Sequence, residues 1–215
     1  MDRKPRCRGN GVTLPEVLTA VIILAVIVGS VSAIYAASMR GWYQGASMTY
    51  AEQKASWVIQ RMVPDIQQAL SITPASSPYD TSCIAVQLPA RTYDGYSGVY
   101  LNQVSTDAEG KPYLVPGNHV VYYRGDEYGN LDVDGDRIWR RLTDPSGGTI
   151  LKQQEIADNV VDNSDDGTGS PKPMFIYWPD IYRLRSVEVT VTVEETRGHR
   201  TATASMTGEL TLRNN

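Results

Sequence analysis

The stretch GVTLPEVLTAVIILAVIVGSVSAIYAASM, residues 11–39, carries a single charged side chain, Glu16, at the start of a long apolar run. The 23 residues from Val17 to Met39 hold no charge. As a helix they would extend about 35 Å. The hydrocarbon core of a bilayer is roughly 30 Å thick, so the run is long enough to cross it. A carboxylate at the edge of such a segment is costly to bury, so it needs either water or a cation.

A basic leader, MDRKPRCRGNG, precedes the apolar run. It holds four cations against one acidic residue: Arg3, Lys4, Arg6, Arg8 and Asp2. Positive charge ahead of a first apolar helix keeps the N-terminus on the cytoplasmic side of the membrane. We therefore expect a single-pass protein of the inner (cytoplasmic) membrane, with the N-terminus in the cytoplasm and the rest of the chain on the other side.

Two ordinary interpretations of the run are a secretory signal peptide, cleaved after VSA at 31–33 or YAA at 35–37, and an uncleaved anchor. The apolar core of a signal peptide spans about 7–15 residues, which is shorter than this run. Neither interpretation explains Pro15 and Glu16. Proline is tolerated in the first helical turn, where N–H groups have no intrahelical partner, so Pro15 fits a helix that begins near Val12. Glu16 would then lie near the positive end of the helix dipole.

The segment RGNG-VTLPEVLTAVIILAVIV resembles the N-terminal signal of type IV prepilins and of type II secretion pseudopilins. That signal is a short basic leader ending in Gly, followed by a hydrophobic residue, Thr, Leu, a variable residue, Glu and an apolar helix. The residues in these positions are Gly11, Val12, Thr13, Leu14, Pro15 and Glu16. The resemblance covers roughly the first 40 residues, and its specificity lies in the whole constellation rather than in any one residue.

This resemblance implies a processing pathway. A prepilin peptidase would cut between Gly11 and Val12 and would N-methylate the new Val12 terminus. The subunit would then pass from the membrane lipid through an inner-membrane assembly platform into a filament of other pilin or pseudopilin subunits. In that family the carboxylate that matches Glu16 is thought to pair with the N-terminal ammonium of a neighbour. Such pairing makes physical sense, because a charge that enters an apolar filament core needs a counter-ion.

The sequence divides into a leader (1–11), a membrane and filament-core helix (12–40), an amphipathic continuation (41–70) and a β-rich head (71–215). Apolar residues recur every three or four positions in the continuation and predict a face that packs on a sheet: Met48, Ala51, Ala55, Ile59, Met62, Ile66 and Leu70. Pro64 predicts a kink, or a helix end near Val63 with a short second helix after it. The expected fold class is α+β, and the resemblance implies the pilin fold, a long helix on an antiparallel sheet.

The sequence of the head predicts short β-strands separated by turns. The predicted strands are CIAVQL, GVYLNQV, HVVYYR, RIWRRL and MFIYW, starting at residues 83, 98, 119, 137 and 174. The clearest hairpin joins SVEVTVTVEE to TATASMTGELTLR through TRGHR. Its first strand places Val187, Val189, Val191 and Val193 on one face, which predicts an antiparallel sheet with one dry side. Five apolar residues alternate in the second strand: Ala202, Ala204, Met206, Leu210 and Leu212.

Two acidic loops partly match calcium-binding loops. In DVDGD, Asp132, Asp134 and Asp136 occupy alternate positions. In DNSDDG the corresponding residues are Asp162, Ser164, Asp166 and Gly167. The twelfth positions are Thr143 and Pro173, so no bidentate Glu closes either loop. Both loops are weak candidates for Ca²⁺ sites, and turns alone account for Asp and Gly in such places. We expect no other cofactor.

Net charge and cysteine content argue against two features: a nucleic-acid-binding surface and an intrachain disulfide. The whole chain has a formal net charge of −4 and the leader has +3, so the mature chain would carry −7. This balance argues against a general nucleic-acid surface, and we interpret Arg137, Arg140 and Arg141 as a solvated strand face. Cys7 would leave with the leader. Cys83 alone cannot form an intrachain disulfide, and we expect it to be a small buried residue.

No catalytic signature appears in the sequence, and we expect no enzyme. His119 and His199 have no recognisable partners. The expected function is a minor pilin or pseudopilin, a structural and assembly subunit. The layout VVYYR…IWRRL…EIADNVV…FIYW…LTLRN resembles the larger minor subunits of the PilW and GspJ kind. The alternative is a membrane-anchored binding or sensor module with a β-rich head that does not polymerise.

Overall fold

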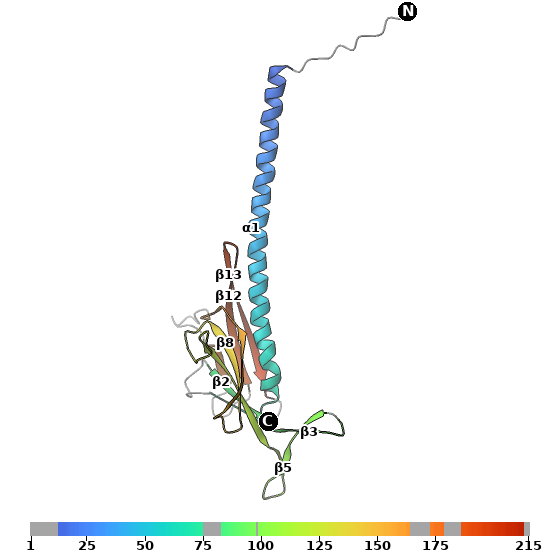
Figure 1. The fold of residues 1–215 in the computed structure, drawn as a ribbon, viewed down its shortest axis with the longest axis vertical. Helices are drawn as coiled ribbons and strands as arrows, with labels where there is room; N and C mark the ends of the chain where they lie inside the picture. Colours follow the sequence, from blue (N-terminus) through green and yellow to red (C-terminus); the bar gives the residue numbers. More distant parts are fainter. Residues whose placement is uncertain (1–12, 75–82, 98, 164–172, 179–185, 213–215) are drawn as a thin grey trace, which may run out of the picture.

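A single long helix and an antiparallel β-sheet head form this α+β protein (Figure 1). The structure, a computed structural model, describes residues 13–74, 83–97, 99–163, 173–178 and 186–212. Helix α1 (Leu14–Gln67) has 54 residues and is therefore about 80 Å long. The head lies beside its C-terminal half, and the N-terminal half stands clear of the head.

Helix α1 continues through Pro64 as one element, so the predicted helix end near Val63 is wrong. Pro64 lies in the last turn. There the backbone N–H of Gln68 donates to the Pro64 carbonyl at 3.3 Å, which completes one more turn after the proline. Met62 and Ile66, on either side of Pro64, are both fully buried, and their packing holds the final turn on the head. Tertiary packing therefore outweighs the local cost of the proline.

The buried stripe of α1 agrees with the predicted periodicity from Ala51 to Ile66 but differs at both ends: Leu70 lies after the helix and is half-buried. At the start of the stripe Met48 is 41% exposed, and the buried positions there are Ser47 and Ala51. The Ser47 hydroxyl donates to the carbonyls of Tyr43 (2.9 Å) and Arg200 (3.3 Å). This buried polar side chain is therefore hydrogen-bonded both to its own helix and to the head. Val58 is also fully buried and was missed, because it lies between the predicted positions.

The head contains a five-stranded antiparallel sheet in the order β1-β2-β7-β8-β9. Its strands are β1 (Ser71–Pro74), β2 (Cys83–Pro89), β7 (Pro116–Gly125), β8 (Arg137–Thr143) and β9 (Ile150–Ala157). Three of them, β2, β7 and β8, were predicted from their β-branched and aromatic residues. β9 was not, because Lys152, Gln153 and Gln154 interrupt its alternation. Cys83 is buried at the start of β2, as expected.

The second sheet is centred on β12 (Ser186–Arg197). β13 (Arg200–Thr211) pairs along one edge of it, and β10 (Val160–Val161) and β11 (Phe175–Trp178) pair along the other. The predicted dry face is confirmed: Val187, Val189, Val191 and Val193 are all fully buried. Gly198 has φ +63° in the two-residue turn between β12 and β13, a conformation that favours glycine.

Both sheets and the helix share one hydrophobic core. Ile84, Val86, Val120, Tyr122 and Ile138 come from the five-stranded sheet and the four valines from β12, and they meet Val58, Met62 and Ile66 of α1. The two remaining sheets are small hairpins, β3 (Arg91–Asp94) with β4 (Val99–Asn102) and β5 (Val104–Thr106) with β6 (Pro112–Leu114). These hairpins lie outside the core, at the end of the molecule farthest from the start of the helix (Figure 1).

Candidate functional site at the N-terminal half of the helix

The N-terminal half of α1 presents a continuous apolar surface. Every residue from Thr13 to Ser38 is exposed, including the large side chains of Leu18, Ile23, Leu24 and Ile34. By length and composition this is a helix that could cross a membrane, and none of its most apolar window is covered by the head. A soluble protein rarely exposes so large an apolar patch, and patches of this kind mark contacts with a membrane or with another protein.

Hydroxyl groups within this segment are satisfied by the helix itself. Thr19 donates to the carbonyls of Pro15 and Glu16, both at 3.0 Å, and Ser30 donates to the carbonyl of Val26 at 2.8 Å. These bonds remove the cost of placing the hydroxyls in an apolar environment. The surface therefore behaves as apolar even at its polar residues.

The helix begins with an acidic cap. Thr13 is the N-cap residue. The helix begins at Leu14, whereas the predicted start was near Val12, and Pro15 lies in its first turn. The Glu16 carboxylate accepts bonds from the Thr13 backbone N–H at 3.2 Å and from the Thr13 hydroxyl at 3.1 Å. Its negative charge lies where the helix dipole favours an anion. Because both partners are on exposed Thr13, the carboxylate remains accessible to a cation from another chain.

Gly11 and Val12 lie outside the described residues. Cleavage between them, methylation of Val12 and the pairing of Glu16 with a neighbour therefore stay predictions. In the structure Glu16 lies in the first turn of α1. Cleavage after Gly11 would leave this turn close to the new N-terminus.

A hairpin tip holds α1 where the head begins. The Arg197 guanidinium lies 3.6 Å from the centroid of the Tyr50 ring, and Gly198 packs beside Tyr43. Together with the Ser47 bond to Arg200, these contacts fix the β12–β13 turn on the helix. The head therefore covers α1 only from about this level onward, and this boundary defines the uncovered N-terminal half.

Lys54 joins the helix to both sides of the head. Its ammonium bonds the Asp158 carboxylate at 2.6 Å and also contacts the Glu195 carboxylate. Burial alone would lower the pKa of Lys54, but the bonds to Asp158 and Glu195 outweigh it and raise the pKa. The same bond from Lys54 lowers the pKa of Asp158. Sequence reasoning missed this cluster, although a lone lysine beside the apolar stripe at Ala51 and Ala55 was a usable signal.

The prediction of a solvated arginine face on β8 is wrong. Strand alternation sends Arg140 to one face and Arg137 and Arg141 to the other. Arg140 lies 2.9 Å from the Asp65 carboxylate of α1, which also accepts a bond from the Tyr122 hydroxyl at 2.6 Å. Burial raises the pKa of Tyr122, so the hydroxyl stays protonated and donates to Asp65.

Arg137 and Arg141 are paired as well. Arg137 bonds Glu155 at 2.6 Å, and Arg141 donates to the Tyr123 hydroxyl at 2.8 Å. The Arg141 guanidinium also lies 4.8 Å from the centroid of the Tyr123 ring. The three arginines therefore tie strands together rather than offer a cationic surface.

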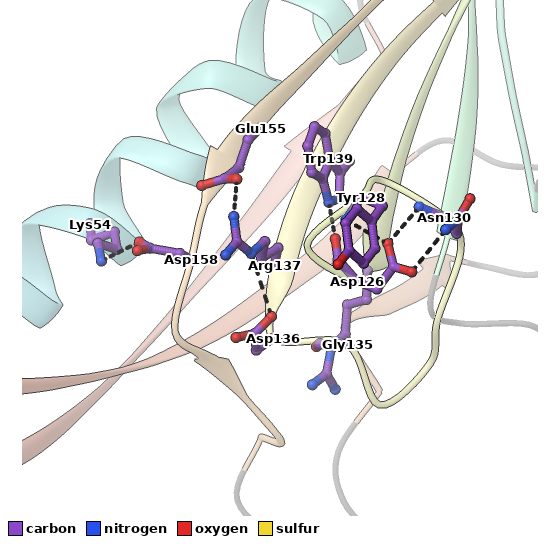
Figure 2. Close-up of polar contacts among 11 residues, drawn as sticks. Lys54, Asp126, Tyr128, Asn130, Gly135, Asp136, Arg137, Trp139, Glu155 and Asp158 are labelled. Atoms are coloured by element: carbon purple, nitrogen blue, oxygen red, sulfur yellow. Dashed lines mark hydrogen bonds and ion pairs between the residues drawn. The ribbon is translucent and has the colours of Figure 1, made fainter.

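The segment from Asp126 to Asp136, which ends in the first acidic loop, forms turns; Figure 2 shows Asp126 bonded to Asn130 and Asp136 facing Arg137. Asp126 accepts bonds from the backbone N–H groups of Tyr128 and Asn130, both at 2.9 Å, and Asp132 accepts one from that of Asp134 at 3.1 Å. These hydrogen bonds hold the pKa of Asp126 below its usual value, with the Asn130 side chain contributing most. Asp136 instead faces Arg137, at 3.7 Å.

Neither acidic loop gathers a set of metal ligands among the described residues. No group of three or more His, Cys, Asp or Glu side chains is arranged there to hold a metal ion. In the second loop, Asp162 bonds Arg124 at 2.6 Å, while Ser164, Asp166 and Gly167 lie outside the described residues. The two histidines lie in different places. His199 is exposed in the turn of the β12–β13 hairpin. His119 lies on β7, where its backbone carbonyl accepts a hydrogen bond from the Thr143 hydroxyl at 3.5 Å.

These features define an α+β protein with one uncovered apolar helix that could span a membrane and an antiparallel head fixed to its other half. No protein-family model matches the chain, and no curated protein or solved structure matches it either.

Proposed function

We propose that the chain is a minor type IV pilin or type II secretion pseudopilin, with the pilin fold, that a prepilin peptidase processes at Gly11 and N-methylates at Val12. One observation carries the proposal. A prepilin-type signal, residues 11–16, leads directly into a helix whose N-terminal half is apolar and uncovered and whose C-terminal half is fixed to an antiparallel head. The large head favours a minor subunit over a major pilin, which is usually smaller.

The uncovered helix supports this assignment physically. In the inner membrane lipid would cover the apolar surface, and in a filament the helices of neighbouring subunits would cover it. Glu16 would then leave the polar boundary of the membrane, and the new Val12 ammonium of a neighbour would neutralise it. The amine exists only after cleavage, so processing and assembly are coupled.

Substitution of Glu16 tests this assignment against the alternative of an anchored module that does not polymerise. We expect Glu16→Ala to leave cleavage at Gly11 largely intact and to reduce recovery of the subunit in sheared filaments. Glu52→Ala is the matched control, because Glu52 is an exposed carboxylate on the same helix, far from its start. Replacing Gly11 with a bulky residue should block processing altogether. Normal filament recovery of Glu16→Ala would contradict the pairing role.

A further inference from the structure

The two small hairpins form a pair of arms, the β3–β4 arm (residues 91–102) and the β5–β6 arm (residues 104–114), at the end of the head. Outside the helix, exposed large apolar side chains concentrate on these arms. Among the described residues outside the helix, seven of the twelve such side chains lie there: Tyr93, Tyr96, Val99, Tyr100, Leu101, Val104 and Tyr113. Such a concentration on a short stretch of chain marks an interaction surface.

Both faces of the β3–β4 arm carry exposed apolar side chains. Residues opposite one another in an antiparallel pair share a face, so the pairing of Tyr93 with Tyr100 puts both rings on one side, with centroids 5.2 Å apart. Val99 and Leu101 lie on the other side by the same register. A two-stranded hairpin with no sheet or helix against it is only marginally stable in water. An arm built this way is suited to being enclosed by a partner.

The charged groups of the β3–β4 arm, Arg91 and Asp94, are hydrogen-bonded within the chain. Asp94 accepts bonds from the backbone of Tyr96 and from the Ser97 hydroxyl, at 3.1 and 2.6 Å. Asp107 accepts the Lys111 backbone N–H at 2.7 Å, and Arg91 bonds Gln68. The two charged side chains of the β3–β4 arm are therefore both hydrogen-bonded within the chain, and its exposed apolar side chains match an uncharged surface.

The arms are held rigidly at their base. Three backbone bonds close a ring where the hairpins meet: Ala90 N–H to Val115 O (2.8 Å), Val115 N–H to Gln103 O (3.0 Å) and Gln103 N–H to Ala90 O (2.8 Å). Gly117 packs on this junction so closely that a Cβ atom would lie 2.6 Å from the Ala90 nitrogen. A fixed base lowers the entropic cost of binding.

Three other occupants fit less well. If the N-terminal half of α1 is in the membrane, about 40 Å of helix (residues 40–67) separates that membrane from the arms. A nucleic acid would need a cationic surface. A symmetric contact with a second copy would bury one face of each arm and leave the other in water, because such contacts use the same patch on both chains.

We propose that the arms insert into an uncharged recess on the head of a different subunit of the same filament, an inference that rests on the proposed function. The seven side chains expose roughly 800 Å², if each large side chain offers about 150–250 Å² when fully exposed. A stable protein interface takes about 800 Å² from each partner. Tyrosine is also enriched at the centres of such interfaces.

Photo-crosslinking of the full chain in native membranes tests the proposal. A benzoylphenylalanine replaces Tyr96 or Tyr100, and the control places it at Tyr128, an exposed tyrosine outside the arms. We expect positions 96 and 100, but not 128, to crosslink to another chain that carries the Gly-hydrophobe-Thr-Leu-x-Glu signal. The double variant Y96S/Y100S should reduce co-isolation of that chain at least about tenfold, and Y128S should not.

Crosslinks to a second copy, to lipid or to nothing would overturn the proposal. Reading the mature N-terminus in the same sample separates the two hypotheses. A methylated Val12 terminus without arm crosslinks overturns the inference alone. An intact Met1 terminus, with arm crosslinks to a chain that lacks the signal, overturns the proposed function and the inference together.

Discussion

Lys54 is the residue whose charge most directly links the helix to the head. Its contacts with Asp158 and Glu195 join α1 to the end of β9 and to β12, at the level where the uncovered half of the helix ends. The Asp65–Arg140 pair does the same for β8, nearer the end of α1. These links orient the helix on a core that apolar packing alone would leave free to slide, because hydrophobic contacts are not directional.

Replacing Lys54 by Met should destabilise the head by about 1–2 kcal/mol at pH 7, between the values for exposed and buried ion pairs. The pKa of Lys54 is raised from 10.5, so its contribution is complete below that pH and is lost as the pH rises through the folded value. The pKa of Asp158 is lowered from 3.8, so its contribution is present above that pH and is lost on acidification.

Denaturant unfolding of the detergent-solubilised chain, followed by tryptophan fluorescence, measures this difference. We expect the gap between wild type and Lys54→Met to be constant between these limits and to shrink as the pH falls below 3.8. Lys152→Met is the control, because Lys152 is exposed on β9. A gap that does not change with pH would show that Lys54 acts through packing alone.

Single residues of the candidate site were predictable where local rules govern them. Pro15 and Glu16 fit the first turn of a helix on elementary grounds, and the structure places both there. Lys54, Asp65 and Arg140 were not predictable as partners, because they lie on elements far apart in the sequence. Their types gave no sign of pairing, and Arg140 was expected to face solvent.

Among the elements, the buried face of α1 offers a clear comparison between two methionines. Met62 is fully buried against the sheets, whereas Met48, next to buried Ser47 at the start of the covered region, is 41% exposed. Met62→Ala should cost about 2–5 kcal/mol in the free energy of unfolding, because it leaves a cavity in the core. Met48→Ala should change it by less than about 0.5 kcal/mol. Equal losses would mean that α1 is rotated relative to the arrangement described here.

The acidic turn after β7 should be indifferent to calcium. Asp132 already accepts the backbone N–H of Asp134, Asp136 faces Arg137, and Gly135 lies so close to β7 that a Cβ atom there would meet the Gly125 carbonyl oxygen at 2.3 Å. We expect the melting temperature to be the same with EGTA and with added Ca²⁺. A lower melting temperature on chelation would reveal a site that this arrangement does not provide.

Elements were predictable in proportion to the regularity of their patterns. The valine alternation of β12 identified the strand and its apolar buried face; Thr190 and Thr192 on the opposite face are buried as well, which the alternation did not predict. β9 was missed since its centre is polar and only half-buried. Of the two alternatives predicted at Pro64, a kink or a helix end near Val63, the helix end is wrong, because the packing of Met62 and Ile66 on the sheets cannot be read from local propensity.

At the scale of the whole molecule, helix α1 has two parts: a C-terminal half that the head covers and an uncovered N-terminal half. The head buries one face of α1 from Ser47 onward, and no described part of the chain covers the apolar surface before Ser47. The α+β class and the long N-terminal helix were predictable, since both follow from hydrophobic patterning. The arms were not, because their significance depends on what the fold leaves exposed.

The central claim is that the chain is a processed pilin-like subunit, and the most direct measurement is its mature N-terminus, by mass spectrometry of membranes from the native host. The account predicts an N-methylated Val12 as the first residue. A terminus after residue 33 or 37 would instead indicate a secretory signal peptide, and an intact Met1 in a host with an active prepilin peptidase would indicate a plain anchor. Either result would contradict the account and remove the role proposed for Glu16.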